Sequence, residues 1–189
     1  NYWQLDRTIQ REAARIYDDD EFEWAEPRLD AFGEVVGTSI ADNADYVDKH
    51  GPELRTHAKR GEVQNFVRYP EELKENERLA YGAGVVADSF QAPPGRDEPL
   101  SLAHYFGMGY LVSYAETSGM LCPVAMTDGV ALVLEKFDDG SLSEYYEALT
   151  ACNREDLIEG AMFLTEEQGG SDVGANETTA EYDEESGYW

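Results

Sequence analysis

Positive charge is scarce in this sequence. Its 189 residues include 14 Lys and Arg against 40 Asp and Glu, which gives a formal net charge of −26. Proteins that bind nucleic acid neutralise phosphates with clusters of Lys and Arg. The composition therefore argues against nucleic-acid contact through this part of the protein.

Cysteines and long apolar runs are also scarce. Cys122 and Cys152 form no C-x-x-C pair and have no histidine at metal-ligand spacing, so we expect no metal site and a reducing, cytoplasmic location. No apolar run approaches the ~18 residues that a membrane span needs, and no signal peptide opens the chain, so no membrane partner is expected. The chain begins at Asn1 rather than Met, which indicates that residues are missing at the front.

Apolar residues are nevertheless abundant enough to build a core. Hydrophobic residues make up 42% of the chain and aromatic residues 12%, whereas a disordered acidic chain would be poor in both. A folded surface with this excess of carboxylates is typical of a halophile, because concentrated salt screens their repulsion. We therefore expect a halophilic protein.

Helical periodicity fills the first part of the sequence. Apolar positions predict a helix over residues 5–16, a long helix from Pro27 to near Gly51, and another helix opening at Pro70. The polar stretch 53–67 has no clear period and is interpreted as a surface loop.

Further helices are predicted downstream. The stretch 100–119 is the most apolar and predicts a central helix buried on most sides, with Gly107 and Gly109 packed closely against a neighbour. Pro123 fits the first turn of a helix that Gly140 terminates. Ser141 and Glu144 have the spacing of a capping box that opens a short helix. Together these segments predict an α-helical domain of five to six helices over residues 1–157.

The pattern changes after Gly160. The short apolar run 161–165 and the β-prone run 178–182 predict strands, and a turn would lead into a return strand at Tyr188–Trp189. Because a strand without its partner leaves backbone groups unpaired, the chain is interpreted as a truncated fragment in which residues 158–189 begin a β-domain. The alternative is a naturally short chain that acts as an interaction module.

Two adjacent glycines mark the segment that is most informative about function. Gly169 and Gly170 stand between the hydroxyl residues Thr165 and Ser171. Paired glycines let backbone N–H groups approach a ligand closely, and successive N–H groups form a concavity that binds anions. Hydroxyls can bond phosphate or the edge of a heteroaromatic ring. These residues alone leave open either a site for a phosphate-bearing cofactor or an ordinary glycine-rich turn.

A longer match favours the cofactor. Residues 162–173, Met-Phe-Leu-Thr-Glu-Glu-Gln-Gly-Gly-Ser-Asp-Val, resemble the flavin-binding signature of the acyl-CoA dehydrogenase family. Thr178 and Ala180 continue this signature in register. The Glu-Gln-Gly-Gly-Ser-Asp version, and Leu-Cys-Pro-Val-Ala-Met-Thr at 121–127, are similar to the alkylation-response (adaptive response) branch. The resemblance implies a mainly α fold, with the helical domain of that family followed by the truncated start of its middle β-barrel domain.

The resemblance also implies FAD as the cofactor and oxidation of a CoA thioester at its α,β carbons. The backbone near Leu164, with the Thr165 hydroxyl, would meet the pyrimidine edge of the flavin, and Gly170 and Ser171 would contact the pyrophosphate. Glu166 and Asp172 are interpreted as local hydrogen-bond formers rather than catalysts. The implied cofactor-binding residues are Met162, Phe163, Leu164, Thr165, Gly169, Gly170 and Ser171.

Much of the family's machinery lies outside this sequence. Relatives carry the catalytic base in a C-terminal helical domain, so no catalytic residue is assigned here and the fragment is expected to be inactive alone. The implied partners are an acyl-CoA substrate, a flavin electron acceptor protein and further copies of the intact chain in a homo-oligomer. The alternative is an alkylation-response type flavoprotein that protects nucleic acid and has little dehydrogenase activity.

Overall fold

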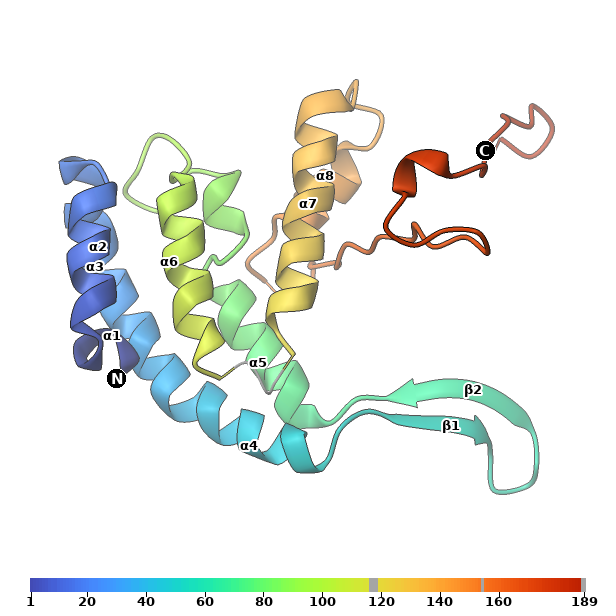
Figure 1. The fold of residues 1–189 in the computed structure, drawn as a ribbon, viewed down its shortest axis with the longest axis horizontal. Coiled ribbons are helices and arrows are strands. Elements are labelled where there is room, and N and C mark those ends of the chain that lie inside the picture. Colours follow the sequence, from blue (N-terminus) through green and yellow to red (C-terminus); the bar gives the residue numbers. More distant parts are fainter. Residues whose placement is uncertain (116–118, 154, 188–189) are drawn as a thin grey trace.

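Helices form most of the computed structural model, which describes residues 1–115, 119–153 and 155–187 (Figure 1). This confirms the predicted mainly α fold. In chain order the elements are α1 (Tyr2–Leu5), α2 (Arg7–Ile16), α3 (Asp19–Val35), the π-helical turn η1 (Val36–Ile40), α4 (Ala41–Lys49), β1 (Glu53–His57), β2 (Val63–Arg68), α5 (Glu71–Gly82), the 3-10 turn η2 (Ala87–Ser89), α6 (Leu102–Ser113), α7 (Leu121–Phe137), α8 (Ser143–Leu149) and the 3-10 turn η4 (Val173–Ala175). None of these helices is long and apolar enough to cross a membrane.

The first predicted helix is divided by Asp6. One carboxylate oxygen of Asp6 accepts hydrogen bonds from the backbone N–H groups of Thr8, at 2.7 Å, and Ile9, at 3.2 Å, and so caps α2. The other oxygen accepts the hydroxyls of Tyr110 and Tyr114. These bonds, that of Tyr114 first, lower the pKa of Asp6 to about 2. Asp6 therefore opens α2 and also ties it to α6.

A continuous helical rod runs through α3, η1 and α4 (Figure 1). The prediction that this rod starts at Pro27 is wrong, because Pro27 lies inside α3 and the helix begins at Asp19. Acidic residues fill its first turn, where carboxylates are favoured by the positive end of the helix dipole. The apolar face of the rod enters the core with Ala25, Leu29, Phe32, Val36, Ile40 and Ala44. Because two of the predicted helices are each divided in two, into α1 and α2 and into α3 and α4, the described residues contain eight α-helices rather than five or six.

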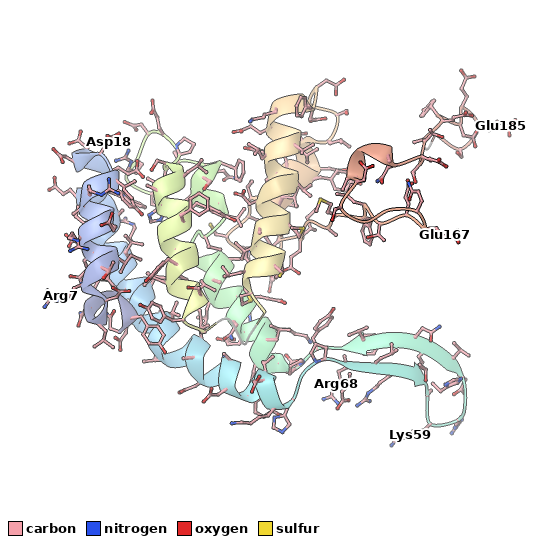
Figure 2. The ribbon with its side chains drawn as sticks, viewed as in Figure 1. Arg7, Asp18, Lys59, Arg68, Glu167 and Glu185 are labelled. Atoms are coloured by element: carbon pink, nitrogen blue, oxygen red, sulfur yellow. The ribbon has the colours of Figure 1, made fainter. Side chains whose placement is uncertain are left out.

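The polar stretch 53–67 is an antiparallel hairpin, not the predicted loop. Strand β1 pairs with β2 from Glu53 opposite Arg68 to His57 opposite Val63, with an irregularity between Arg55 and His57. Every residue of both strands is exposed, and the hairpin projects from the helical body (Figure 1), with the side chains of Lys59 and Arg68 on it (Figure 2). Since neither face is buried, the sequence lacks the alternation of apolar and polar residues by which a strand is recognised.

Helix α6 stands at the centre of the body with only part of its surface buried. Met108, Leu111 and Val112 lie in the core, and Gly107 is confirmed as a close contact, since a Cβ there would lie 2.9 Å from the Tyr17 hydroxyl. At Gly109 a Cβ would meet only an ordinary contact at 3.9 Å. The prediction of burial on most sides is wrong, because the face that carries Leu102, Phe106, Tyr110 and Tyr114 is exposed.

The junction between α7 and α8 depends on Asp138 rather than on a capping box. Pro123 lies in the first turn of α7, as predicted. The Asp138 carboxylate accepts hydrogen bonds from the backbone N–H groups of Gly140, at 2.9 Å, and Leu142, at 3.2 Å. Helix α8 begins after these residues, at Ser143, and has no side-chain cap. The predicted pairing of Ser141 with Glu144 is therefore wrong.

After Leu157 the chain forms an arm, residues 158–187, that extends beyond α7 (Figure 1). The predicted strands at 161–165 and 178–182 are absent from the structure, which has irregular backbone in both runs. A strand needs a neighbouring strand for its backbone hydrogen bonds, and the arm supplies none at these positions. The predicted return strand at 188–189 lies outside the described residues.

Candidate functional site

The arm is anchored on α7 at Gly160. The Gly160 N–H donates to the hydroxyl oxygen of Thr127 at 3.0 Å. The Tyr81 hydroxyl lies 3.3 Å from the same Thr127 oxygen and donates to Glu159 at 3.1 Å. A Cβ on Gly160 would lie 2.7 Å from the Met126 carbonyl oxygen, so only glycine allows this approach. The structure thus joins two segments singled out in the sequence, 121–127 and the start of the glycine-rich arm.

Tyr81 and Asp128 are members of this region that sequence analysis did not single out. Burial raises the pKa of Tyr81 above the usual range, and burial likewise raises the pKa of Asp128, which follows Thr127 on α7. The Asp128 Oδ1 atom is buried and has no hydrogen-bond partner among the described residues. No local sequence pattern marks either residue, because their burial results from packing between distant helices.

Glu166 organises the glycine-rich loop of the arm. Its carboxylate accepts hydrogen bonds from the backbone N–H groups of Glu177 and Thr178, both at 2.8 Å, from the Thr178 hydroxyl, and from the Gln168 side chain at 2.8 Å. The bond from the Thr178 hydroxyl is the main reason that the pKa of Glu166 is lowered to about 2. Glu166 is therefore a local hydrogen-bond former, as predicted, whereas Asp172 accepts through its main-chain carbonyl, from Ala175 at 3.2 Å.

Further bonds close the loop. The Asn176 side-chain amide donates to the Leu164 carbonyl at 2.9 Å, and Gln168 donates to the Ala175 carbonyl at 3.0 Å. Because of these bonds, residues 164–168 lie against residues 175–178, and the glycine turn is held at the closed end of the loop.

The two glycines of the turn differ in what the fold requires of them. Neither has a positive φ, so backbone conformation does not demand glycine at either position. A Cβ on Gly169 would lie 3.3 Å from the Glu166 nitrogen, which is tight, whereas a Cβ on Gly170 would meet nothing within 4 Å. The fold therefore leaves open space beside Gly170.

The predicted cofactor-binding residues lie on this one loop and are mostly exposed. Phe163 is 93% exposed, Met162 61% and Leu164 43%. Thr165, Gly170 and Ser171 are also exposed. Consecutive apolar side chains at this exposure are unusual on a protein surface and make this loop a candidate for contact with a ligand or another domain.

Comparison with known proteins identifies the family. Residues 1–156 match the family model of the adaptive response protein AidB N-terminal domain. The chain belongs to this family. The match confirms the acyl-CoA dehydrogenase-like, adaptive-response-type N-terminal part that the resemblance predicted.

Two solved structures share the fold of this AidB N-terminal domain. ACDH-11 of Caenorhabditis elegans, crystallised in complex with C11-CoA, superposes with a TM-score of 0.80 at 19% identity over 90% of this chain. The apo form of Bd2924 superposes with a TM-score of 0.80 at 24% identity over 92% of this chain. The chain spans only 29% of the first and 34% of the second. No curated protein matches the sequence closely enough to count as a relative.

Proposed function

We propose that this chain is the N-terminal part of an FAD-dependent acyl-CoA dehydrogenase-like oxidoreductase that oxidises a CoA thioester at its α,β carbons. The observation that supports this most is the arm loop, which presents exposed apolar residues, two hydroxyls and an unobstructed glycine on one small surface. A family match over residues 1–156 makes a flavin the cofactor to test first.

The residues of the loop fit a flavin in chemical terms. Thr165 and the backbone beside Leu164 would hold the pyrimidine edge of the ring, where hydrogen-bond donors stabilise the negative charge of the reduced flavin. Gly170 and Ser171 would bond the pyrophosphate through a main-chain N–H and a hydroxyl, since nothing in the fold occupies the space beside Gly170. Met162, Phe163 and Gly169 complete the proposed set. The bound FAD would accept the hydride.

The arm cannot be the whole site, because residues 155–189 contain no Lys or Arg. A pyrophosphate carries two negative charges, and here it would face Glu166 and its acidic neighbours without a compensating cation. We therefore propose that other parts of the intact protein supply that charge, that residues 158–189 begin its middle β-domain after a helical domain of residues 1–157, and that this chain alone is inactive.

The remaining elements of the proposal concern partners. An acyl-CoA substrate is proposed because ACDH-11, which shares the fold, was crystallised with C11-CoA. The family resemblance further suggests a flavin electron acceptor protein, a cytoplasmic location and homo-oligomerisation of the intact protein.

The decisive experiment compares the intact protein with the 189-residue chain. The intact protein should purify with about one FAD per chain and reduce it on addition of an acyl-CoA, observed as bleaching near 450 nm. The 189-residue chain should purify colourless and bind added FAD weakly. An intact protein without flavin, or a stoichiometrically yellow 189-residue chain, contradicts the proposal.

The second candidate is an alkylation-response flavoprotein that protects nucleic acid, and the match to the AidB N-terminal domain favours it specifically. The net charge of −26 opposes DNA contact through this part, so a basic surface elsewhere in the intact protein would be required. DNA binding by the intact protein at physiological salt, without bleaching by any acyl-CoA, would favour this candidate over the first.

A further inference from the structure

A cavity that is separate from the arm lies between α3, α5 and α6. It has a volume of about 610 Å³ and shares no residue with the arm. Apolar side chains form most of its wall, including Phe32, Val35, Leu79 and Met108. This size and lining are those of a site for a small organic molecule.

Two buried nitrogen atoms in this cavity lack partners. His104 is only 2% exposed, and its Nε2 atom has no hydrogen-bond partner among the described residues. The nearest carboxylate, Oδ2 of Asp88, lies 3.7 Å away, beyond hydrogen-bonding distance. The indole Nε1 of Trp24, which also lines the cavity, is likewise buried and without a partner. Buried polar groups are almost always hydrogen-bonded, so these two atoms indicate a missing acceptor.

A cation stands beside them. The Arg28 guanidinium lies 3.5 Å from the centroid of the Trp24 ring and donates to the Trp24 carbonyl at 2.9 Å. In a chain with 40 carboxylates, Arg28 forms no ion pair with any residue in the described ranges. An arginine stacked on an indole whose N–H has no partner provides donors that suit a carboxylate.

The apolar wall continues from this polar end. Trp24, Arg28, Phe32 and Val35 follow one another at helical spacing along α3, and all four line the cavity. At 1.5 Å per residue, the distance from Trp24 to Val35 along the helix is about 16 Å. The cavity therefore has hydrogen-bond donors at one end and an apolar wall along the rest. This arrangement is complementary to a carboxylate that carries an apolar tail.

We infer that this cavity binds a small organic carboxylate with an apolar tail. Arg28 and the Trp24 indole N–H hold the carboxylate, and the tail lies along α3 toward Val35. Asp88 already places a carboxylate 3.7 Å from His104, so the carboxylate of the ligand takes the Arg28 side of the cavity. The net charge of −26 opposes anion binding over the whole molecule, so binding at this place depends on its local donors and apolar wall.

Octanoate titrated into the 189-residue chain tests the inference, with the Trp24 indole N–H resonance as the readout. A Trp24→Phe variant assigns that resonance. We expect a saturable shift with a dissociation constant on the order of 1 mM, as suits a ligand of this size. Octan-1-ol, which has the same tail and no carboxylate, should bind at least about tenfold more weakly.

Three variants separate the site from adventitious binding. Arg28→Gln should weaken octanoate at least about tenfold, whereas Arg11→Gln, an exposed arginine on α2, should leave it unchanged. Ala31→Phe fills the cavity from an exposed position and should abolish binding without disturbing the core. Equal binding of octan-1-ol, an unchanged affinity in Arg28→Gln or Ala31→Phe, or no saturable shift in the wild type would each overturn the inference.

Discussion

Replacing Gly160 with alanine should release the arm from α7 while leaving the helical body folded. The new Cβ would lie 2.7 Å from the Met126 carbonyl oxygen, 2.8 Å from Val130 Cγ2 and 2.9 Å from Thr127 Cα. Two of these three atoms are backbone atoms of α7, which cannot move aside without bending the helix. Overpacking of this kind costs about 1–3 kcal/mol.

Detaching the arm from α7 costs less free energy than straining α7. Its attachment at this point depends on the Gly160 N–H bond to Thr127, which contributes about 0.5–1.5 kcal/mol. Detachment from Gly160 onward therefore costs about as much as, or less than, the clash. Because the clash strains the attached state by about 1–3 kcal/mol, the open state should become the more populated one in the variant. A change of 1.4 kcal/mol is tenfold in population.

Amide hydrogen exchange at position 160 measures this directly. We expect exchange at that amide to become about tenfold faster in Gly160→Ala, while the urea midpoint of the helical body shifts little. Gly170→Ala is the matched control, because its Cβ meets nothing within 4 Å and its φ is not positive. Full protection of residue 160 in Gly160→Ala would refute the proposed anchor.

Three further outcomes are expected. Gly107→Ala places a Cβ 2.9 Å from the Tyr17 hydroxyl and should lower the free energy of unfolding by about 1–3 kcal/mol in urea titrations; an unchanged midpoint would show that α2 and α6 are not in close contact. The folded-state pKa of Glu166 is lowered to about 2 from its ordinary 4.5. The stability that the ionised carboxylate gives the loop is therefore complete above pH 4.5 and is lost as the pH falls toward 2. The Thr178 amide resonance should report this transition, and Glu166→Gln should remove it. The net charge of −26 predicts a thermal midpoint that rises between low and roughly molar salt, and an equally cooperative, equally stable melt in low salt would argue against a halophilic protein.

Regular helices were predictable because their apolar residues recur at the helical period against one core. The ends of those helices were less predictable. Pro27 has the usual identity of a first-turn residue, yet α3 begins eight residues earlier at an acidic run. An internal proline removes one hydrogen bond and its ring crowds the preceding turn, but the packing of Ala25 and Leu29 in the core holds the helix together. Ser141 and Glu144 have the spacing of a capping box. In the structure, however, the Asp138 carboxylate accepts the hydrogen bonds of the Gly140 and Leu142 N–H groups.

The hairpin and the arm show where local sequence is insufficient. Strands β1 and β2 bury neither face, so no alternation reveals them. The glycine turn and Glu166 were predictable from the motif at 162–173, whereas the anchor between Tyr81, Thr127 and Gly160 joins residues far apart in the chain. Hydrophobicity likewise identified α6 as a core helix. It does not show which apolar face of α6 is buried by other helices of this chain and which stays exposed.

A crystal structure of the intact protein purified with FAD is the most direct test of the central claim. The account predicts the flavin ring against Leu164 and Thr165, and the pyrophosphate against Gly170 and Ser171, with its charge balanced by cations from outside residues 155–189. A flavin bound elsewhere, with this loop open to solvent, would contradict it.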